Sequence, residues 1–285
     1  MGARSRYIAL KYLNSQSDVY RKQYPQLVGY TFDLITNLIM VDGRYENEQL
    51  EALKKHVFPK LKHRRICLDI GANIGNHALF FADQFDLVHA FEPHPRTAKI
   101  LTLNAELSGN IRVHPFGLSD QEAVIQAAAI PGNVATTQIG RSDSSEESVE
   151  LNIKPLDMVS EIADLNTIDL IKIDVEGHEL EALRGAEQTI RNCQPIIISE
   201  ALQSDVVDGT TEAMEFLRLL GYGHHYTLRS NRPFSSAPKP IARLITGLTG
   251  IVLGRRPANN FTIEKITKLE RKNHPMVISS VVPLA

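Results

Sequence analysis

The chain is poor in cysteine and has no long hydrophobic stretch, and both shortages narrow the class of protein. Its 285 residues include only Cys67 and Cys193, too few for a disulfide framework or a cysteine-based structural zinc site. No run approaches the roughly 18 apolar residues that a membrane-spanning helix needs. The basic N-terminus leads into Lys11, Ser15 and Asp18 and not into an apolar stretch, so we expect no signal peptide. These absences predict a water-soluble protein of a reducing, cytoplasmic compartment.

Charge is divided unevenly along the chain. Residues 1–65 hold 12 Lys and Arg against 6 Asp and Glu, whereas residues 66–202 hold 8 against 21. The last segment, 203–285, is again basic, with 11 against 6. An acidic centre would repel phosphates, which argues against a nucleic-acid cleft there. Solvated lysines and arginines on peripheral helices are the simpler explanation of the basic ends, and contact with an acidic surface is the alternative.

Apolar runs of strand length alternate with helical segments through the middle of the chain. With 43% hydrophobic and 22% charged residues, the composition is that of a globular protein with a sizeable core. The predicted strands cover 66–70, 87–91, 111–116, 168–173 and 195–199, and the predicted helices cover 74–84, 95–108 and 178–192. Because such alternation requires crossover connections, it predicts a mostly parallel α/β sheet with helices on both faces.

Two segments interrupt or precede this alternation. After the third strand, the short apolar runs Ala123–Ile130 and Val149–Ile153 flank the acidic stretch Ser142–Glu147, which predicts a β-excursion with a solvated tip. Residues 1–62 carry apolar residues at helical spacing. We expect them to form a helical extension in front of a domain that covers 63–285.

The last part of the chain adds a helix, two strands and an insert. Thr211–Leu220 has amphipathic helical spacing, and Tyr222–Leu228 and Asn260–Glu264 have the character of two final strands. The insert at 231–258 repeats apolar residues at helical spacing among basic ones. We predict that it packs against the domain or covers a cleft, and weak membrane-surface contact through residues 239–256 is the alternative.

The most informative motif follows the first predicted strand and reads Asp-Ile-Gly-Ala-Asn-Ile-Gly over residues 69–75. Gly71 and Gly75 permit a tight turn and let a ligand approach the backbone, and open α/β sheets bind ligands at this edge. The third glycine of a nicotinamide dinucleotide site is missing. The carboxylate of Asp69 favours a ligand with an amino or cationic group over a diphosphate. A strand–helix turn with an incidental aspartate is the structural alternative.

A second acidic residue ends the next predicted strand. Glu92 follows Asp69 by 23 residues, and a carboxylate at that position can accept both hydroxyls of a ribose. Together with the two glycines, these residues predict a nucleoside site without a phosphate site, and S-adenosylmethionine is a ligand of that kind. Asp120, after the third strand, is a candidate contact for the adenine amino group, with a solvated turn as the alternative.

Titratable side chains crowd the end of the fourth predicted strand, where residues 172–179 read Lys-Ile-Asp-Val-Glu-Gly-His-Glu. Neighbouring carboxylates raise one another's pKa, which suits a general base. We therefore predict a catalytic set of Lys172, Asp174, Glu176 and His178. An ion pair with a carboxylate is the alternative for the lysine, and helix capping is the simpler role of Glu179. No full set of metal ligands can be named among these residues, so we expect no metal.

These motifs resemble those of the FkbM-type family of S-adenosylmethionine-dependent methyltransferases. The likeness rests on residues 69–75, on Phe91-Glu92-Pro93, and above all on 168–179 with the Leu-Arg-Gly-Ala that follows at 183–186. The resemblance implies a class I methyltransferase, Rossmann-like fold with a seven-stranded sheet whose last strand is antiparallel. It also implies methyl transfer to a hydroxyl of a sugar, a polyketide or a similar metabolite.

The resemblance further assigns roles to single residues. The family's cofactor positions correspond to Asp69, Gly71, Asn73, Gly75 and Glu92, and its Lys-x-Asp-x-Glu-Gly stretch corresponds to Lys172, Asp174, Glu176 and Gly177. The N-terminal extension and the insert depart from a minimal family member. Because those parts would select the acceptor, the resemblance leaves the substrate open.

Two functions therefore compete. The first is an O-methyltransferase that acts on a small-molecule or glycan acceptor, with Asp174, Glu176 or His178 as the base. The second is a non-catalytic cofactor-binding or membrane-surface protein of the same fold, which has no need to crowd carboxylates at one strand end. Nucleic-acid methylation is disfavoured by the acidic centre and by the lack of an Asn/Asp-Pro-Pro-Tyr/Phe motif. Glu200, which ends the fifth strand, fits the same cleft or a salt bridge to a helix equally well.

Overall fold

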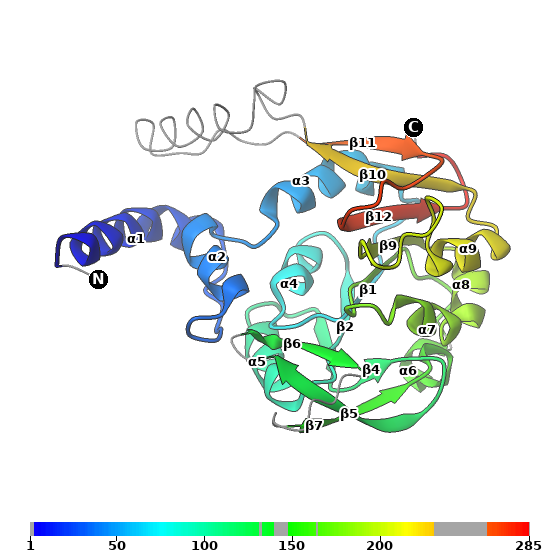
Figure 1. Cartoon of the computed structure of the whole chain (residues 1–285), viewed down its shortest axis with the longest axis horizontal. Helices are drawn as coiled ribbons and strands as arrows, with labels where there is room; N and C mark the ends of the chain where they lie inside the picture. The colour runs from blue at the N-terminus through cyan, green and yellow to red at the C-terminus, as the bar shows by residue number, and fades with distance from the viewer. Residues whose placement is uncertain (1–2, 131–132, 140–147, 164, 231–260, 285) are drawn as a thin grey trace.

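The alternating strands form one eight-stranded sheet. A computed structural model describes residues 3–130, 133–139, 148–163, 165–230 and 261–284. The sheet contains β1 (Ile66–Ile70), β2 (Leu87–Phe91), β3 (Ile111–His114), β8 (Leu170–Ile173), β9 (Ile196–Ala201), β10 (His224–Ser230), β11 (Phe261–Ile266) and β12 (His274–Ser280). Their order across the sheet is β11-β10-β12-β9-β8-β1-β2-β3 (Figure 1). The pairings from β3 through β9 are parallel, whereas β12 runs antiparallel to both β9 and β10.

The predicted α/β class is confirmed, but the predicted number of seven strands is wrong. β11 pairs antiparallel with β10 and adds an eighth strand at the edge. β10 and β11 correspond to the two final strands expected from the sequence, so the strand that was missed is β12. Met276, Val277 and Ile278 of β12 are buried, but so short an apolar run has no periodicity that distinguishes a strand from other structure. The antiparallel last strand implied by the resemblance is confirmed.

Helices cover both faces of the sheet. α3 (Asn47–His56), α4 (Asn76–Ala82) and α5 (Pro95–Ala105) pack on one face, and α6 (Ser160–Ala163), α7 (Glu179–Arg184), α8 (Glu187–Cys193) and α9 (Glu212–Leu219) pack on the other (Figure 1). Successive residues of a strand point to opposite faces, so Cys67 packs with the first group and Leu68 with the second. Burial on both faces explains why these strands are continuous apolar runs in the sequence.

The N-terminal residues are helical. α1 (Ala3–Gln23) and α2 (Leu34–Asp42) precede α3 and the 3-10 turn η1 (Phe58–Lys60), and α1 extends away from the sheet (Figure 1). In contrast, Leu50 and Leu53 of α3 and Phe58 of η1 are buried in the core. None of the helices in the described ranges combines the length and hydrophobicity that a membrane span requires. The division of the chain near residue 62 stays a prediction.

A second, four-stranded sheet is inserted between β3 and β8. It contains β4 (Gly117–Leu118), β5 (Ala123–Ile130), β6 (Asn133–Ile139) and β7 (Ser148–Lys154), in the order β4-β7-β5-β6, and the 3-10 turn η2 (Leu156–Met158) follows it. The predicted β-excursion is therefore confirmed. Its expected acidic tip, Ser142–Glu147, and the insert expected at 231–258 lie outside the described residues.

Candidate active site

A cavity of about 220 Å³ opens at the carboxyl ends of β1, β2, β8 and β9. Because parallel strands end at the same edge of a sheet, the loops that follow them converge there. Seven of the residues singled out in the sequence line this cavity: Gly71, Asn73, Glu92, Lys172, Asp174, Glu176 and His178. The fold thus brings three of the six predicted cofactor residues together with all four predicted catalytic residues.

The turn after β1 leaves no room for a side chain at Gly71. Its φ of +75° lies in the left-handed region, and a Cβ atom would lie 1.9 Å from the carbonyl oxygen of Asp174. The amides of Gly71 and Ala72 donate to the Phe91 carbonyl at 3.0 and 2.9 Å, which ties the turn to the end of β2. A glycine at this position therefore allows the loops after β1 and β8 to meet at the cavity.

Glu92 is buried at the end of β2 and accepts hydrogen bonds from two backbone amides. The Asn73 amide donates to its Oε2 at 3.0 Å, and the His94 amide donates to its Oε1 at 2.8 Å. Asn73 has a φ of +51°, a left-handed conformation that asparagine tolerates better than most residues. Burial raises the pKa of Glu92 to about 7, although the two amides oppose the shift. Each oxygen keeps a further lone pair, so this group can also accept hydrogen bonds from ligand hydroxyls.

Lys172 is buried between two carboxylates. Its Nζ lies 3.3 Å from Asp69 Oδ1, from Asp174 Oδ2 and from the carbonyl oxygen of Gly71. The contact with Asp69 is an ion pair between two buried side chains. Burial alone would lower the pKa of Lys172, but Asp174 and Asp69 outweigh that effect and raise it. The lysine is therefore charged at neutral pH. Its contacts agree with an ion pair to carboxylates, which the sequence offered as the alternative to a catalytic role.

The loop after β8 adopts an unusual backbone conformation at the cavity. Glu176 has a φ of +56° and Gly177 a φ of +95°. A left-handed glutamate is uncommon, and such residues cluster at functional sites. Glu179 accepts hydrogen bonds from the Val175 and Gly177 amides at 3.1 and 3.3 Å. It therefore supports the loop before α7, whereas the sequence suggested capping of the helix itself.

The three candidate bases of this loop differ in their partners. Asp174 pairs with the buried lysine. The two ring nitrogens of His178 lie 2.9 Å from Ser119 Oγ and 3.5 Å from a carboxylate oxygen of Glu181. Glu176 has no hydrogen bond or ion pair with any other residue in the described ranges. Burial, followed by Asp174, raises the pKa of Glu176 above its usual value.

Five further cavity residues carry polar side chains that were not assigned to the site from the sequence. One is Asn76 of α4, whose side chain forms hydrogen bonds with the Tyr45 backbone. Tyr45 and Glu46 precede α3, and His77 lies in α4. Glu46 Oε2 lies 3.3 Å from His77 Nε2, and the Tyr45 ring stacks on the imidazole at 6.2 Å. No motif marks Tyr45 or Glu46, which belong to the expected helical extension.

The fifth is Glu200, for which the sequence left a cleft position and a salt bridge equally open, and it lines the cavity. Burial, with Asp174 and Glu176 next in effect, raises the pKa of Glu200 to about 8. The carboxyl is therefore largely protonated at neutral pH. This wall of the cavity is acidic, and Lys172, the one buried lysine or arginine among the described residues that line it, is already paired with two carboxylates.

Three predicted cofactor residues do not line the cavity. Asp69 is fully buried opposite Lys172 in the sheet register. Gly75, with a φ of +95°, caps α4. Asp120 is exposed, whereas the adjacent Ser119 is buried and contacts the histidine of the β8 loop. The adenine contact of Asp120 stays a prediction, and Leu118 is the residue of that turn that lines the cavity.

Relatives of the central part of the chain are found among known proteins. Residues 69–223 match the family described as "Methyltransferase FkbM domain". "Hexuronic acid methyltransferase AglP" of Haloferax volcanii is 31% identical over 131 residues, which cover 46% of this chain and 53% of that protein. "Methyltransferase 1" of Beauveria bassiana is 29% identical over 143 residues, which cover 42% and 57%. The chain spans about half the length of the curated relatives it matches.

Solved structures that align with the chain include the following two. The methyltransferase FkbM of Methylobacillus flagellatus aligns with a TM-score of 0.34 and 17% identity, over 65% of this chain and 48% of that chain. A putative O-methyltransferase of Klebsiella pneumoniae aligns with a TM-score of 0.44 and 11% identity, over 96% and 99%.

Proposed function

The chain belongs to the FkbM-domain family of methyltransferases, and from this membership we propose that it methylates a hydroxyl group with S-adenosylmethionine as the methyl donor. A sugar, a polyketide or a related small metabolite is the proposed acceptor. The observation that carries the proposal is the convergence at one cavity of a glycine turn, a buried glutamate and a loop rich in carboxylates. The first two suit a nucleoside, and the third suits removal of a hydroxyl proton.

Gly71, Asn73 and Glu92 are the residues proposed to hold the cofactor. Because Gly71 lacks a Cβ, the backbone of the β1 turn is open to close approach by a ligand. Glu92 would accept the ribose hydroxyls at the lone pairs that the Asn73 and His94 amides leave unused. When bound, S-adenosylmethionine supplies an electrophilic methyl group on a cationic sulfur. Asp69 would support this side indirectly, through the ion pair that fixes the loops around it.

Glu176 is proposed as the general base, ahead of Asp174 and His178. It lines the cavity without an ion-pair partner in the described part of the chain, whereas Asp174 is paired with Lys172. Its raised pKa brings the carboxylate nearer to the operating pH, where a base is most effective. A base of this kind contributes about 100- to 10,000-fold to the rate.

The charge of the cavity favours an acceptor that is neutral or cationic. Glu46, Asp174, Glu176 and Glu200 line it, and an anionic acceptor would be repelled by the ionised members of this group. Hexuronic acid, in the name of the Haloferax relative, is such an anion. We therefore propose that the acceptor of this chain lacks a carboxylate and is a neutral or amino-bearing hydroxyl compound.

Calorimetric titration with S-adenosylhomocysteine tests the cofactor site. Glu92→Ala is expected to weaken binding by about tenfold, because the acceptor proposed for the ribose hydroxyls is lost. Glu187→Ala is the matched control, since Glu187 is an exposed glutamate on α8 that pairs with Arg191. Equal binding by Glu92→Ala and the wild type would contradict the assignment.

Release of S-adenosylhomocysteine from S-adenosylmethionine tests turnover. Neutral, amino-bearing and acidic sugars of matched size serve as acceptors, and turnover is expected with the first two. Preference for the acidic sugars would contradict the proposed acceptor class. Cofactor binding without turnover of any hydroxyl compound would favour the non-catalytic alternative.

A further inference from the structure

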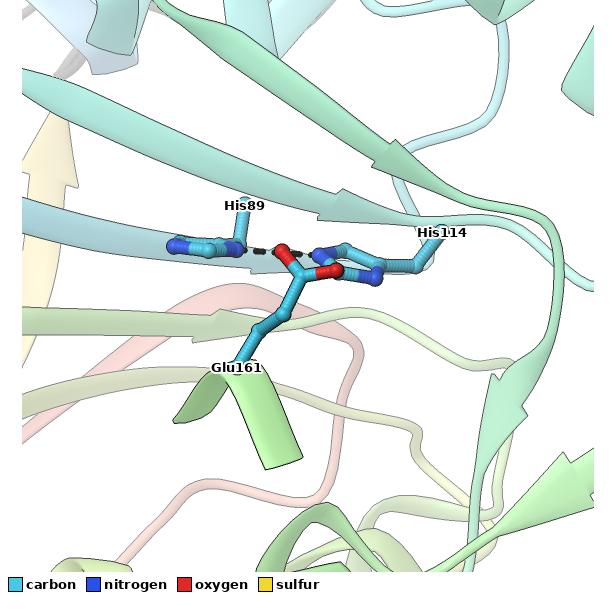
Figure 2. Close-up of side chains that lie close together, drawn as sticks. All are labelled: His89, His114 and Glu161. Carbon is cyan, nitrogen blue, oxygen red and sulfur yellow. Dashed lines mark hydrogen bonds between the residues drawn. The ribbon is translucent and has the colours of Figure 1, made fainter. Parts of the chain in front are cut away.

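Two histidines and a glutamate converge outside the cavity. His89 lies in β2, His114 ends β3, and Glu161 lies in α6. His89 Nδ1 is 2.9 Å from His114 Nε2, and one nitrogen or oxygen of each of the three side chains lies within 4.8 Å of the other two. The glutamate carboxylate sits beside the line that joins the two rings (Figure 2). None of the three residues lines the cavity.

The fold fixes this arrangement from both sides. His89 and Phe91 point to the same face of β2, and the sheet register places Phe91 beside His114. The His114 ring stacks on Phe91 with centroids 4.4 Å apart. From the other side, Ile162 is fully buried and anchors α6 on the same face of the sheet, which brings the neighbouring Glu161 over the two rings.

Both rings lie in the core of the fold, where His89 and His114 are buried. A neutral imidazole carries one lone pair, and the nitrogen that holds it can bind a metal ion. The hydrogen bond between them uses Nδ1 of one ring and Nε2 of the other. In Figure 2 these two nitrogens face each other along the bond, with the Glu161 carboxylate next to it. Both rings therefore have to turn toward the carboxylate to bind a shared ion.

We propose that His89 Nδ1, His114 Nε2 and the Glu161 carboxylate bind one divalent transition-metal ion such as Zn²⁺. Two imidazoles and one carboxylate form a ligand set that suits such ions. Nitrogens 2.9 Å apart subtend roughly 90° at an ion about 2.1 Å from each, which is the usual Zn–N distance. Half of the Glu161 side chain is exposed, so a water molecule can complete the coordination.

The proton balance of binding is simple. The hydrogen bond between the rings needs one N–H, which either histidine can donate. When an ion binds His89 Nδ1 and His114 Nε2, the ring that donated this N–H moves its proton to its other ring nitrogen. One ring therefore changes tautomer, and no net proton is released. Glu161 binds as the carboxylate. Its Oε2 accepts a hydrogen bond from Arg112 Nη1 at 3.0 Å, an exposed contact of the kind that contributes little to stability.

The consequence of the ion would be structural. It would join α6 to the ends of β2 and β3, and the carbonyl oxygen of His114 accepts a hydrogen bond from the Glu92 amide at 3.1 Å. The ion would therefore support the strand ends from which the candidate cofactor residue Glu92 extends. The proposed site does not depend on the proposed function, because its ligands and its test do not involve the cavity.

Titration of Zn²⁺ into the metal-free, untagged full chain tests the site, with calorimetry and elemental analysis as readouts. One ion per chain is expected. Glu161→Gln keeps an acceptor for Arg112 but removes the charge, and we expect at least about tenfold weaker binding, as for other losses around metal ligands. Arg112→Gln removes a cation next to the ion and is expected to tighten binding, a result that a merely structural ion pair would not produce.

Two controls separate this result from non-specific binding. His63→Gln removes an exposed histidine elsewhere, and Glu187→Gln removes an exposed glutamate from α8, so both are expected to bind Zn²⁺ like the wild type. Glu161 and Arg112 are exposed, so their variants are expected to fold, which circular dichroism checks. The proposal is overturned if the wild type binds no stoichiometric Zn²⁺, or if Glu161→Gln binds it as tightly as the controls.

Discussion

Replacement of Lys172 by methionine tests the role of the buried ion pair at the centre of the site. Methionine preserves most of the side-chain volume and removes the charge. Asp69 is fully buried, so its carboxylate would lose its cationic partner in surroundings of low dielectric. Asp174 is about one-third exposed, so water can partly replace the lysine there. We therefore expect the destabilisation to come mainly from Asp69.

The structure sets the size of this effect. Removal of one partner from a buried ion pair typically costs about 3–5 kcal/mol. For a chain of this size, 1 kcal/mol corresponds to roughly 2 °C in Tm, so Lys172→Met is expected to lower Tm by about 6–10 °C. The double variant Lys172→Met/Asp69→Asn removes both charges. Because a neutral, well-packed pair is often no less stable than the ion pair, it is expected to recover at least about 1 kcal/mol.

Urea unfolding of the wild type, both single variants and the double variant gives the coupling energy directly. Asp174→Asn is the matched control, with a smaller expected loss because of its exposure. An unchanged stability of Lys172→Met would refute the inferred role of the lysine. So would a double variant whose loss equals the sum of the two single losses, since the two side chains would then act independently.

Three further predictions concern the cavity. Gly71→Ala is expected to abolish calorimetric binding of S-adenosylhomocysteine because its Cβ would meet the Asp174 carbonyl at 1.9 Å, whereas Gly109→Ala, with no atom within 4 Å, should bind normally. Glu176→Gln is expected to lower kcat by about 100- to 10,000-fold and to leave that binding within about twofold; an unchanged kcat would exclude Glu176 as the base. The pKa of Glu200 is about 8 in the folded chain, which is higher than in the unfolded chain. Protonation of this carboxyl therefore stabilises the folded chain fully at pH values below the unfolded pKa, and this stabilisation is lost as the pH rises through about 8. Glu200→Gln should therefore lose less stability than the wild type between pH 5 and pH 8 in urea unfolding, and identical pH dependence would contradict the raised pKa.

Local sequence patterns predicted most of the fold. The predicted strands at 66–70 and 87–91 agree with β1 and β2 residue by residue, because strands buried on both faces are unbroken apolar runs. The single helix expected at 178–192 begins at Glu179, but it is divided into α7 and α8 at Gly185 and Ala186. β12 was missed because its three central apolar residues are too few to establish a period. Its place between β9 and β10 depends on a long-range pairing.

The site was only partly predictable. Gly71 and Glu92 could be found because each directly follows a strand, and strand ends share one edge of the sheet. Asp69, by contrast, lies inside β1 and faces Lys172 within the sheet, so its carboxylate does not reach the cavity. Glu46 reaches the cavity only because the segment before α3 packs beside α4. The sequence around it contains no signal of that contact.

By itself, the sequence determined where strands and helices alternate and which polar residues stand at strand ends, because hydrophobic periodicity and turn chemistry act between near neighbours. Only the tertiary structure decided which of those groups face each other. Lys172 contacts the Gly71 carbonyl across 101 residues of chain, and His89 meets His114 and Glu161 from three separate elements. Such partners follow from strand register and from the seating of helices on the sheet, which depend on packing between segments that are distant in sequence.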